Sequence, residues 1–111
     1  KKQAKTYFRQ QLTRFEEKIG LQASRLALSN AKTRWGSCNS KGVIRLNWRL
    51  IHYPPHLIDY VIAHETAHLR HLNHSKGFWA EVERLYPNYH AARDALKPFS
   101  PSTMPLLSSL R

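Results

Sequence analysis

The sequence predicts an α+β fold in which helices at both ends of the chain flank a small antiparallel sheet. Apolar residues recur every three to four positions between residues 3 and 19, as in an amphipathic helix. Residues 25–38 read as extended structure, and after one turn cluster residues 43–50 carry the β-branched and aromatic side chains of a returning strand. Beyond Pro54 and Pro55 the helical pattern returns.

The length of 111 residues allows one domain with a single modest core. We expect this domain to span residues 1–97 and a Pro- and Ser-rich, poorly ordered tail to follow at residues 98–111. The first residues, K-K-Q-A-K, include no initiator methionine, so we expect the chain to be part of a longer protein. No apolar run is long enough for a membrane span, and Cys38 is the only cysteine. We therefore expect a cytoplasmic protein without membrane association.

The first predicted helix covers residues 3–19 and ends at Gly20. Its apolar stripe consists of Ala4, Tyr7, Phe8, Leu12, Phe15 and Ile19.

The predicted sheet has extended segments at residues 25–30 and 32–38 and a returning strand at residues 43–50. The cluster N-S-K-G at residues 39–42 is typical of a turn, which predicts an antiparallel hairpin. Gly36, within the hairpin, allows a bulge or a close backbone approach.

Three helices are predicted in the second half of the chain. The first begins at Pro55, a residue suited to the first turn of a helix, and runs to about residue 72. The second follows Ser75, a candidate N-cap, and ends before Pro87. The third spans about residues 88–97.

The helix predicted from Pro55 carries an H-E-x-x-H motif made by His64, Glu65 and His68. On an α-helix the two histidines stand about 6 Å apart along the axis and about 40° around it, so both can reach one metal ion. Glu65 lies about 100° around from His64, and in zinc hydrolases this glutamate is the general base. Because a buried His-Glu-His group without a metal would be costly, we expect a catalytic Zn²⁺ site.

Catalytic zinc usually takes three protein ligands, and two histidines compete for the third place. His71 lies about 10.5 Å along the helix axis from His64, too far for one straight helix to bring both to the same ion. His74 follows Asn73, a residue that tolerates the left-handed conformation found at helix ends. We favour His74 as the third ligand and leave His71 as a surface or second-shell alternative. Glu81 and Glu83 are candidate acceptors for the outer N–H of a metal-bound histidine.

Positive charge is concentrated in the first half of the chain. Residues 1–50 hold 12 Lys and Arg against 2 acidic residues, a net charge of +10, while residues 51–111 hold 6 against 5, a net +1, which together give +11. Such a surface attracts nucleic acid or acidic partners without sequence preference, although solubility is the commoner reason for it. Non-specific nucleic-acid contact through this half is therefore an expectation to test.

Several motifs together resemble the YgjP-like metal-dependent hydrolases and, more distantly, the SprT and Spartan zinc proteases. They are T-R-W-G-S-C at residues 33–38, I-R-L-N-W-R-L at 44–50, the proline pair, the H-E-x-x-H helix, N-H-S at 73–75 and F-W at 78–79. The resemblance implies a small zincin-like domain that holds zinc with His64, His68 and His74 and uses Glu65 as catalytic base.

The leading hypothesis is a zinc metallopeptidase in which Glu65 activates a zinc-bound water to attack a peptide carbonyl of a peptide or protein substrate. The sequence leaves the oxyanion donor open among Tyr53, Tyr89 and His90. The alternative hypothesis is a basic nucleic-acid-associated binding module in which zinc is a structural clip, which would need a closed four-ligand site. The physiological substrate and the oligomeric state do not follow from the sequence.

Overall fold

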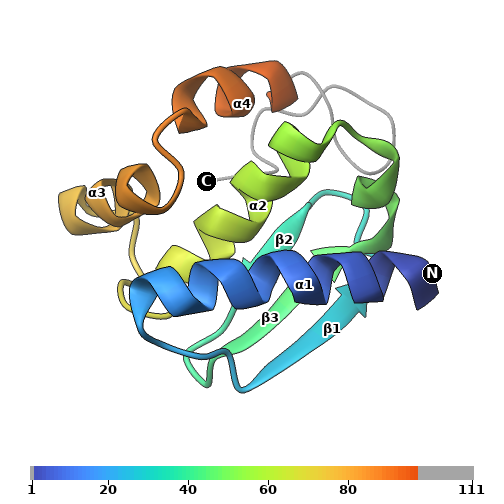
Figure 1. Cartoon of the computed structure of the whole chain (residues 1–111), viewed down its shortest axis with the longest axis horizontal. Helices are drawn as coiled ribbons and strands as arrows, with labels where there is room; N and C mark the ends of the chain where they lie inside the picture. Colours follow the sequence, from blue (N-terminus) through green and yellow to red (C-terminus); the bar gives the residue numbers. More distant parts are fainter. Residues whose placement is uncertain (1, 98–111) are drawn as a thin grey trace.

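A computed structural model describes residues 2–97 of the chain (Figure 1), so the predicted tail at residues 98–111 lies outside the described part. The described elements are α1 (Lys2–Ile19), β1 (Arg25–Ser29), β2 (Gly36–Cys38), β3 (Val43–Asn47), a 3-10 helix (Trp48–His52), α2 (Pro55–Ala67), α3 (Lys76–Leu85) and α4 (Tyr89–Leu96). The predicted α+β fold is confirmed. Within residues 2–97, no helix is long and apolar enough to cross a bilayer.

The sheet is mixed, with strand order β1-β3-β2. The predicted hairpin is confirmed, because β2 pairs antiparallel with β3 across the turn at residues 39–42. Gly42 adopts a φ of 80°, and the Asn39 side chain accepts hydrogen bonds from the backbone N–H groups of Lys41 and Val43. The expectation of a wholly antiparallel sheet is wrong, since β1 pairs with β3 in parallel.

Strand β3 is shorter than predicted because the side chain of Asn47 ends it. This buried amide accepts a hydrogen bond from the backbone N–H of Arg49, which starts the 3-10 helix. The same amide donates to the carbonyl oxygens of Ala31 and Arg34 and so fastens the loop before β2. Asn47 therefore joins the end of β3 to the entrance of β2.

Helix α2 is the centre of the molecule and contacts α1, α3, α4 and the sheet (Figure 1). Every residue from Tyr60 to Ala67 is buried, which explains why the sequence there is apolar on all sides except for the motif residues and Thr66, whose hydroxyl donates to the carbonyl of Ile62. The site chemistry is thus carried by the most enclosed helix of the domain.

The C-terminal end of α2 differs from the prediction. The helix ends at Ala67 rather than near residue 72, and the N–H of its cap residue, His68, bonds to the carbonyl of Glu65. Such i→i+3 bonds tighten the last turn of a helix. The chain continues past His68 in tight turns, whose backbone N–H groups at residues 69–71 bond to the carbonyls of Thr66 and Ala67.

The two C-terminal helices agree with the sequence prediction. The hydroxyl of Ser75 accepts a hydrogen bond from the N–H of Phe78 and caps α3, as predicted. Pro87 lies in the short connection before α4. Because His74 immediately precedes the cap residue Ser75, the start of α3 constrains where that histidine lies.

Candidate metal centre

Three histidines converge at the end of α2. His64 lies in the helix, His68 caps it, and His74 comes back from the loop before α3. One ligand nitrogen from each lies within 4.8 Å of the other two, and this group does not include His71. Nitrogens bound to one tetrahedral zinc stand about 3.4 Å apart, a separation that small ring rotations can reach because His74 is exposed.

His68 is held in the orientation that a metal ligand needs. Its Nδ1 lies 2.9 Å from the carbonyl oxygen of His71, which can only accept, so Nδ1 carries the proton and Nε2 is left to ligate. Burial lowers the pKa of the His68 imidazole below its ordinary value of 6.5, against the raising effect of the Glu65 carboxylate. His68 is therefore neutral at pH 7, as metal binding requires.

His71 contributes through its backbone rather than its ring. Its imidazole packs over Gly77 of α3, where a Cβ atom would meet His71 Cε1 at 3.0 Å. The early end of α2 turns the His71 carbonyl back toward His68. Sequence reasoning missed this role, because any residue can supply a backbone carbonyl.

Glu65 is buried on α2 between the histidines and the sheet, with 2% of its surface exposed. Its Oε2 lies 3.1 Å from Nδ1 of His64, so this pair leaves Nε2 of His64 as the nitrogen that can serve as a ligand. On its other side Glu65 faces β2. Burial and the Glu65 carboxylate raise the pKa of the Cys38 thiol to about 12, so this thiol stays protonated.

Gly36 of β2 makes room for the Glu65 side chain. A Cβ atom at Gly36 would meet Glu65 Cγ at 2.9 Å, Glu65 Oε2 at 3.1 Å and a methyl group of Val61 at 3.2 Å. The predicted close approach at Gly36 is thus confirmed, and the group that approaches is the candidate base.

Replacing Gly36 with alanine is expected to displace the Glu65 carboxylate and lower kcat at least tenfold with metal content unchanged. Overpacking of this kind also costs roughly 1–3 kcal/mol of stability, which a urea titration would measure. Ser37→Ala, on the opposite face of the same strand, is the matched control. A Gly36→Ala protein with normal kcat would show that Glu65 tolerates the displacement.

Phe78 forms a common platform for the three imidazoles. Its fully buried ring lies with its centroid 5.0 Å from that of His64, 4.4 Å from His68 and 4.9 Å from His74. Trp79, the next residue, packs against His64 and His74. From the sequence, Phe78 and Trp79 were part of the family resemblance only, because their contacts with the histidines depend on how α3 docks on α2.

Glu81, a candidate acceptor for the outer N–H of a metal-bound histidine, pairs with arginines instead. It is buried on α3, where it accepts hydrogen bonds from the guanidinium of Arg84 and lies 3.4 Å from that of Arg70. The Glu81 carboxylate is therefore paired with the guanidinium groups of Arg84 and Arg70 and not with a histidine. Glu83, the other candidate, is exposed on α3.

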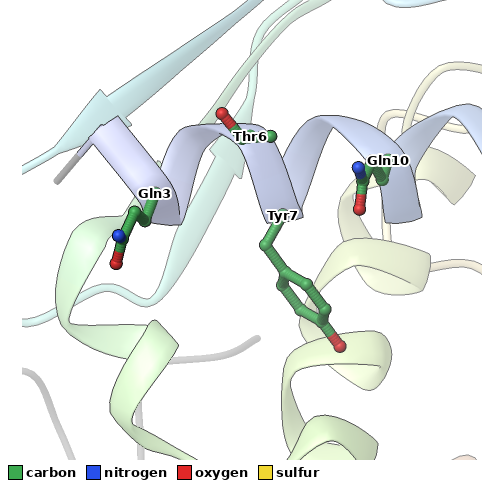
Figure 2. Close-up of a pocket in the computed structure, with 4 residues that line it drawn as sticks. All are labelled: Gln3, Thr6, Tyr7 and Gln10. Carbon is green, nitrogen blue, oxygen red and sulfur yellow. The ribbon is translucent and has the colours of Figure 1, made fainter.

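A hollow borders one of the three histidines, His68. A hollow of about 330 Å³ is bordered by His68, by residues 69, 70 and 72, by the turn at residues 39–42 and by residues 21–22. A second hollow, of about 380 Å³, lies on α1 and is lined by Gln3, Thr6, Tyr7 and Gln10 (Figure 2). These four residues offer neither a carboxylate nor an imidazole. Of these two hollows, the one beside His68 is therefore the one that borders the candidate metal centre.

Comparisons with known proteins identify a family and a similar fold. A family model described as YgjP-like, metallopeptidase domain, matches residues 1–99. The crystal structure of the metallopeptidase zymogen of Pyrococcus abyssi abylysin is similar, with a TM-score of 0.72 and 23% sequence identity over 80% of this chain and 90% of that one. At this identity the likeness shows a shared fold. A search of the curated proteins found no match.

Proposed function

Because the chain belongs to the YgjP-like family of metallopeptidase domains, we propose that it is a zinc-dependent peptidase with Glu65 as general base. The observation that carries this proposal is the group of His64, His68 and His74, whose ligand atoms lie within 4.8 Å of one another beside buried Glu65. Three imidazole ligands suit zinc, and a three-ligand site keeps a position open for catalysis.

The chain's own residues account for the proton transfers. Held by His64, His68 and His74, a zinc ion would act as a Lewis acid, lowering the pKa of water toward 7 and polarising a peptide carbonyl. Glu65 takes a proton from the attacking water and passes it to the leaving amine. The His71 carbonyl keeps His68 in its ligating tautomer, and Gly36 lets Glu65 lie against the sheet.

Strand β2 supports the proposal on the substrate side. It is an edge strand of the sheet and runs past Glu65, as the close approach at Gly36 shows. An extended peptide paired with this edge would be held by main-chain hydrogen bonds, which tolerate many sequences. A side chain of that peptide would then find room in the hollow beside His68.

The alternative function, a binding module with a structural zinc clip, requires a fourth ligand. Among the described residues, the metal-binding group contains the three histidines only, and His74 is exposed. This arrangement favours an open site.

Metal removal tests the two functions against each other. We expect a chelator to abolish cleavage of a denatured protein substrate, one equivalent of zinc to restore it, and the circular dichroism spectrum of the metal-free protein to stay folded. A structural clip predicts the reverse, namely unfolding on chelation and no cleavage with any divalent metal added back. Parallel additions of manganese, cobalt and nickel would identify which metal supports activity.

A further inference from the structure

Carboxylate side chains are confined to the helices of the domain, whereas lysines and arginines occur on the helices and on the sheet region alike. All seven acidic residues lie on helices: Glu16 and Glu17 on α1, Asp59 and Glu65 on α2, Glu81 and Glu83 on α3, and Asp94 on α4. From residue 18 to residue 58 the chain has no carboxylate side chain. The strands, their connections and the 3-10 helix that follows β3 carry six cations and no carboxylate, and we call these six the basic sheet face: Arg25, Lys32, Arg34, Lys41, Arg45 and Arg49.

The sheet register places two of these cations on the side that faces away from the core. Along β3 the side chains of Ile44 and Leu46 are buried while Arg45 between them is exposed. Arg45 is paired with Ala27 of β1 and Ser37 of β2, which are too small to cover it. Arg25 stands two residues before Ala27 on the same face, about 8 Å diagonally from Arg45 by standard strand spacings.

The other four cations lie at the two ends of this face. Lys41 is in the turn before β3, where its carbonyl accepts a hydrogen bond from Ser24 next to Arg25. Lys32 and Arg34 are exposed in the loop between β1 and β2. Arg49 follows β3. The ion pairs found among residues 2–97 use Arg9, Arg70, Arg84, Arg93 and Lys97, so none of them neutralises the basic sheet face.

An aromatic platform lies at the end of β1 and β3. The guanidinium of Arg49 stacks over the Trp48 ring at 4.7 Å, and both side chains donate to the amide oxygen of Asn30. Nucleobases stack on tryptophan rings and on guanidinium planes. Four of the six cations are arginines, whose planar groups match phosphate in a bidentate way.

We propose that the basic sheet face binds a nucleic-acid strand without sequence preference, with phosphates along Arg25 and Arg45 and a base on the Trp48–Arg49 platform. An acidic polypeptide would match the charge but would leave the stacked platform unused. The surface lies on the side of the sheet opposite the buried residues of β3 and so does not depend on the peptidase proposal.

Anisotropy of a labelled 20-nucleotide single-stranded DNA, titrated with the protein from 25 to 300 mM salt, tests the proposal. We expect Arg25→Gln/Arg45→Gln to weaken binding at 50 mM salt at least tenfold. The log–log salt slope should become shallower by about 1.4, since each phosphate contact on a single strand contributes about 0.7. The matched control, Arg14→Gln/Lys18→Gln, removes the same charge from exposed positions of α1 and is expected to bind like the parent chain.

Three results would overturn the proposal: absence of salt-dependent binding at 25 mM salt, an equal loss in both double variants, or displacement of the DNA by polyglutamate as readily as by unlabelled DNA. Equal losses would mean that net charge alone drives the association. Displacement by polyglutamate would identify an acidic polypeptide as the partner. Circular dichroism of both variants would show that their folds are unchanged.

Discussion

Replacing Glu65 with glutamine is expected to lower kcat by roughly 10²–10⁴-fold, the usual contribution of a positioned general base. Glutamine preserves the shape of the side chain in the space beside Gly36 and His64 but cannot accept a proton. Zinc affinity should stay near that of the parent protein, because the metal-binding group contains three histidines and not Glu65. Steady-state cleavage of a denatured protein, with metal content measured on the same samples, checks both expectations.

Glu83→Gln provides the matched control for this experiment. It makes the same change in charge at an exposed position of α3 and should leave kcat unaltered. If the Glu65 variant kept more than a tenth of the parent kcat, another group would have to act as the base. If it lost its metal as well, the His64–Glu65 contact would be needed to form the site. The loss of kcat could then come from the missing metal and would no longer identify Glu65 as the base.

The fold could be predicted where local sequence decides the structure. The apolar stripe of α1, the turn at residues 39–42 and the Ser75 cap each depend on residues close together in the chain. The parallel pairing of β1 with β3 could not be predicted, because strand order is set by how the sheet packs under the helices. Asn47 is an intermediate case, since its cap to Arg49 is local but its bonds to the preceding loop are not.

The candidate site, like the fold, could be predicted from the sequence only where local spacing decides the geometry. H-E-x-x-H spacing indicated two ligands and a base from sequence alone, and the reach of a straight helix favoured His74 over His71. The structure brings the three favoured histidines together, while their role as metal ligands stays a prediction. The contacts of Phe78 with the three imidazoles and of the His71 carbonyl with His68 could not be predicted from the sequence. Both depend on α2 ending at Ala67 and on α3 docking beside it.

Replacing His74 with alanine is expected to reduce zinc affinity by more than the roughly 10–100-fold that loss of a second-shell partner costs. The change would leave two imidazoles on α2 and remove the one ligand that comes from outside it. Because His74 is exposed and precedes the cap of α3, the fold should survive the substitution. Competition with a chromophoric chelator would measure the affinity, and circular dichroism the fold.

His71→Ala is the control that separates the two histidines. Alanine keeps the backbone carbonyl that accepts from Nδ1 of His68 and removes only the ring that packs over Gly77. Zinc affinity should therefore stay close to that of the parent protein. The opposite ranking, with affinity lost in the His71 variant and kept in the His74 variant, would make His71 the third ligand. That result would require the turn after α2 to rearrange when metal binds, since the His71 ring now lies against α3.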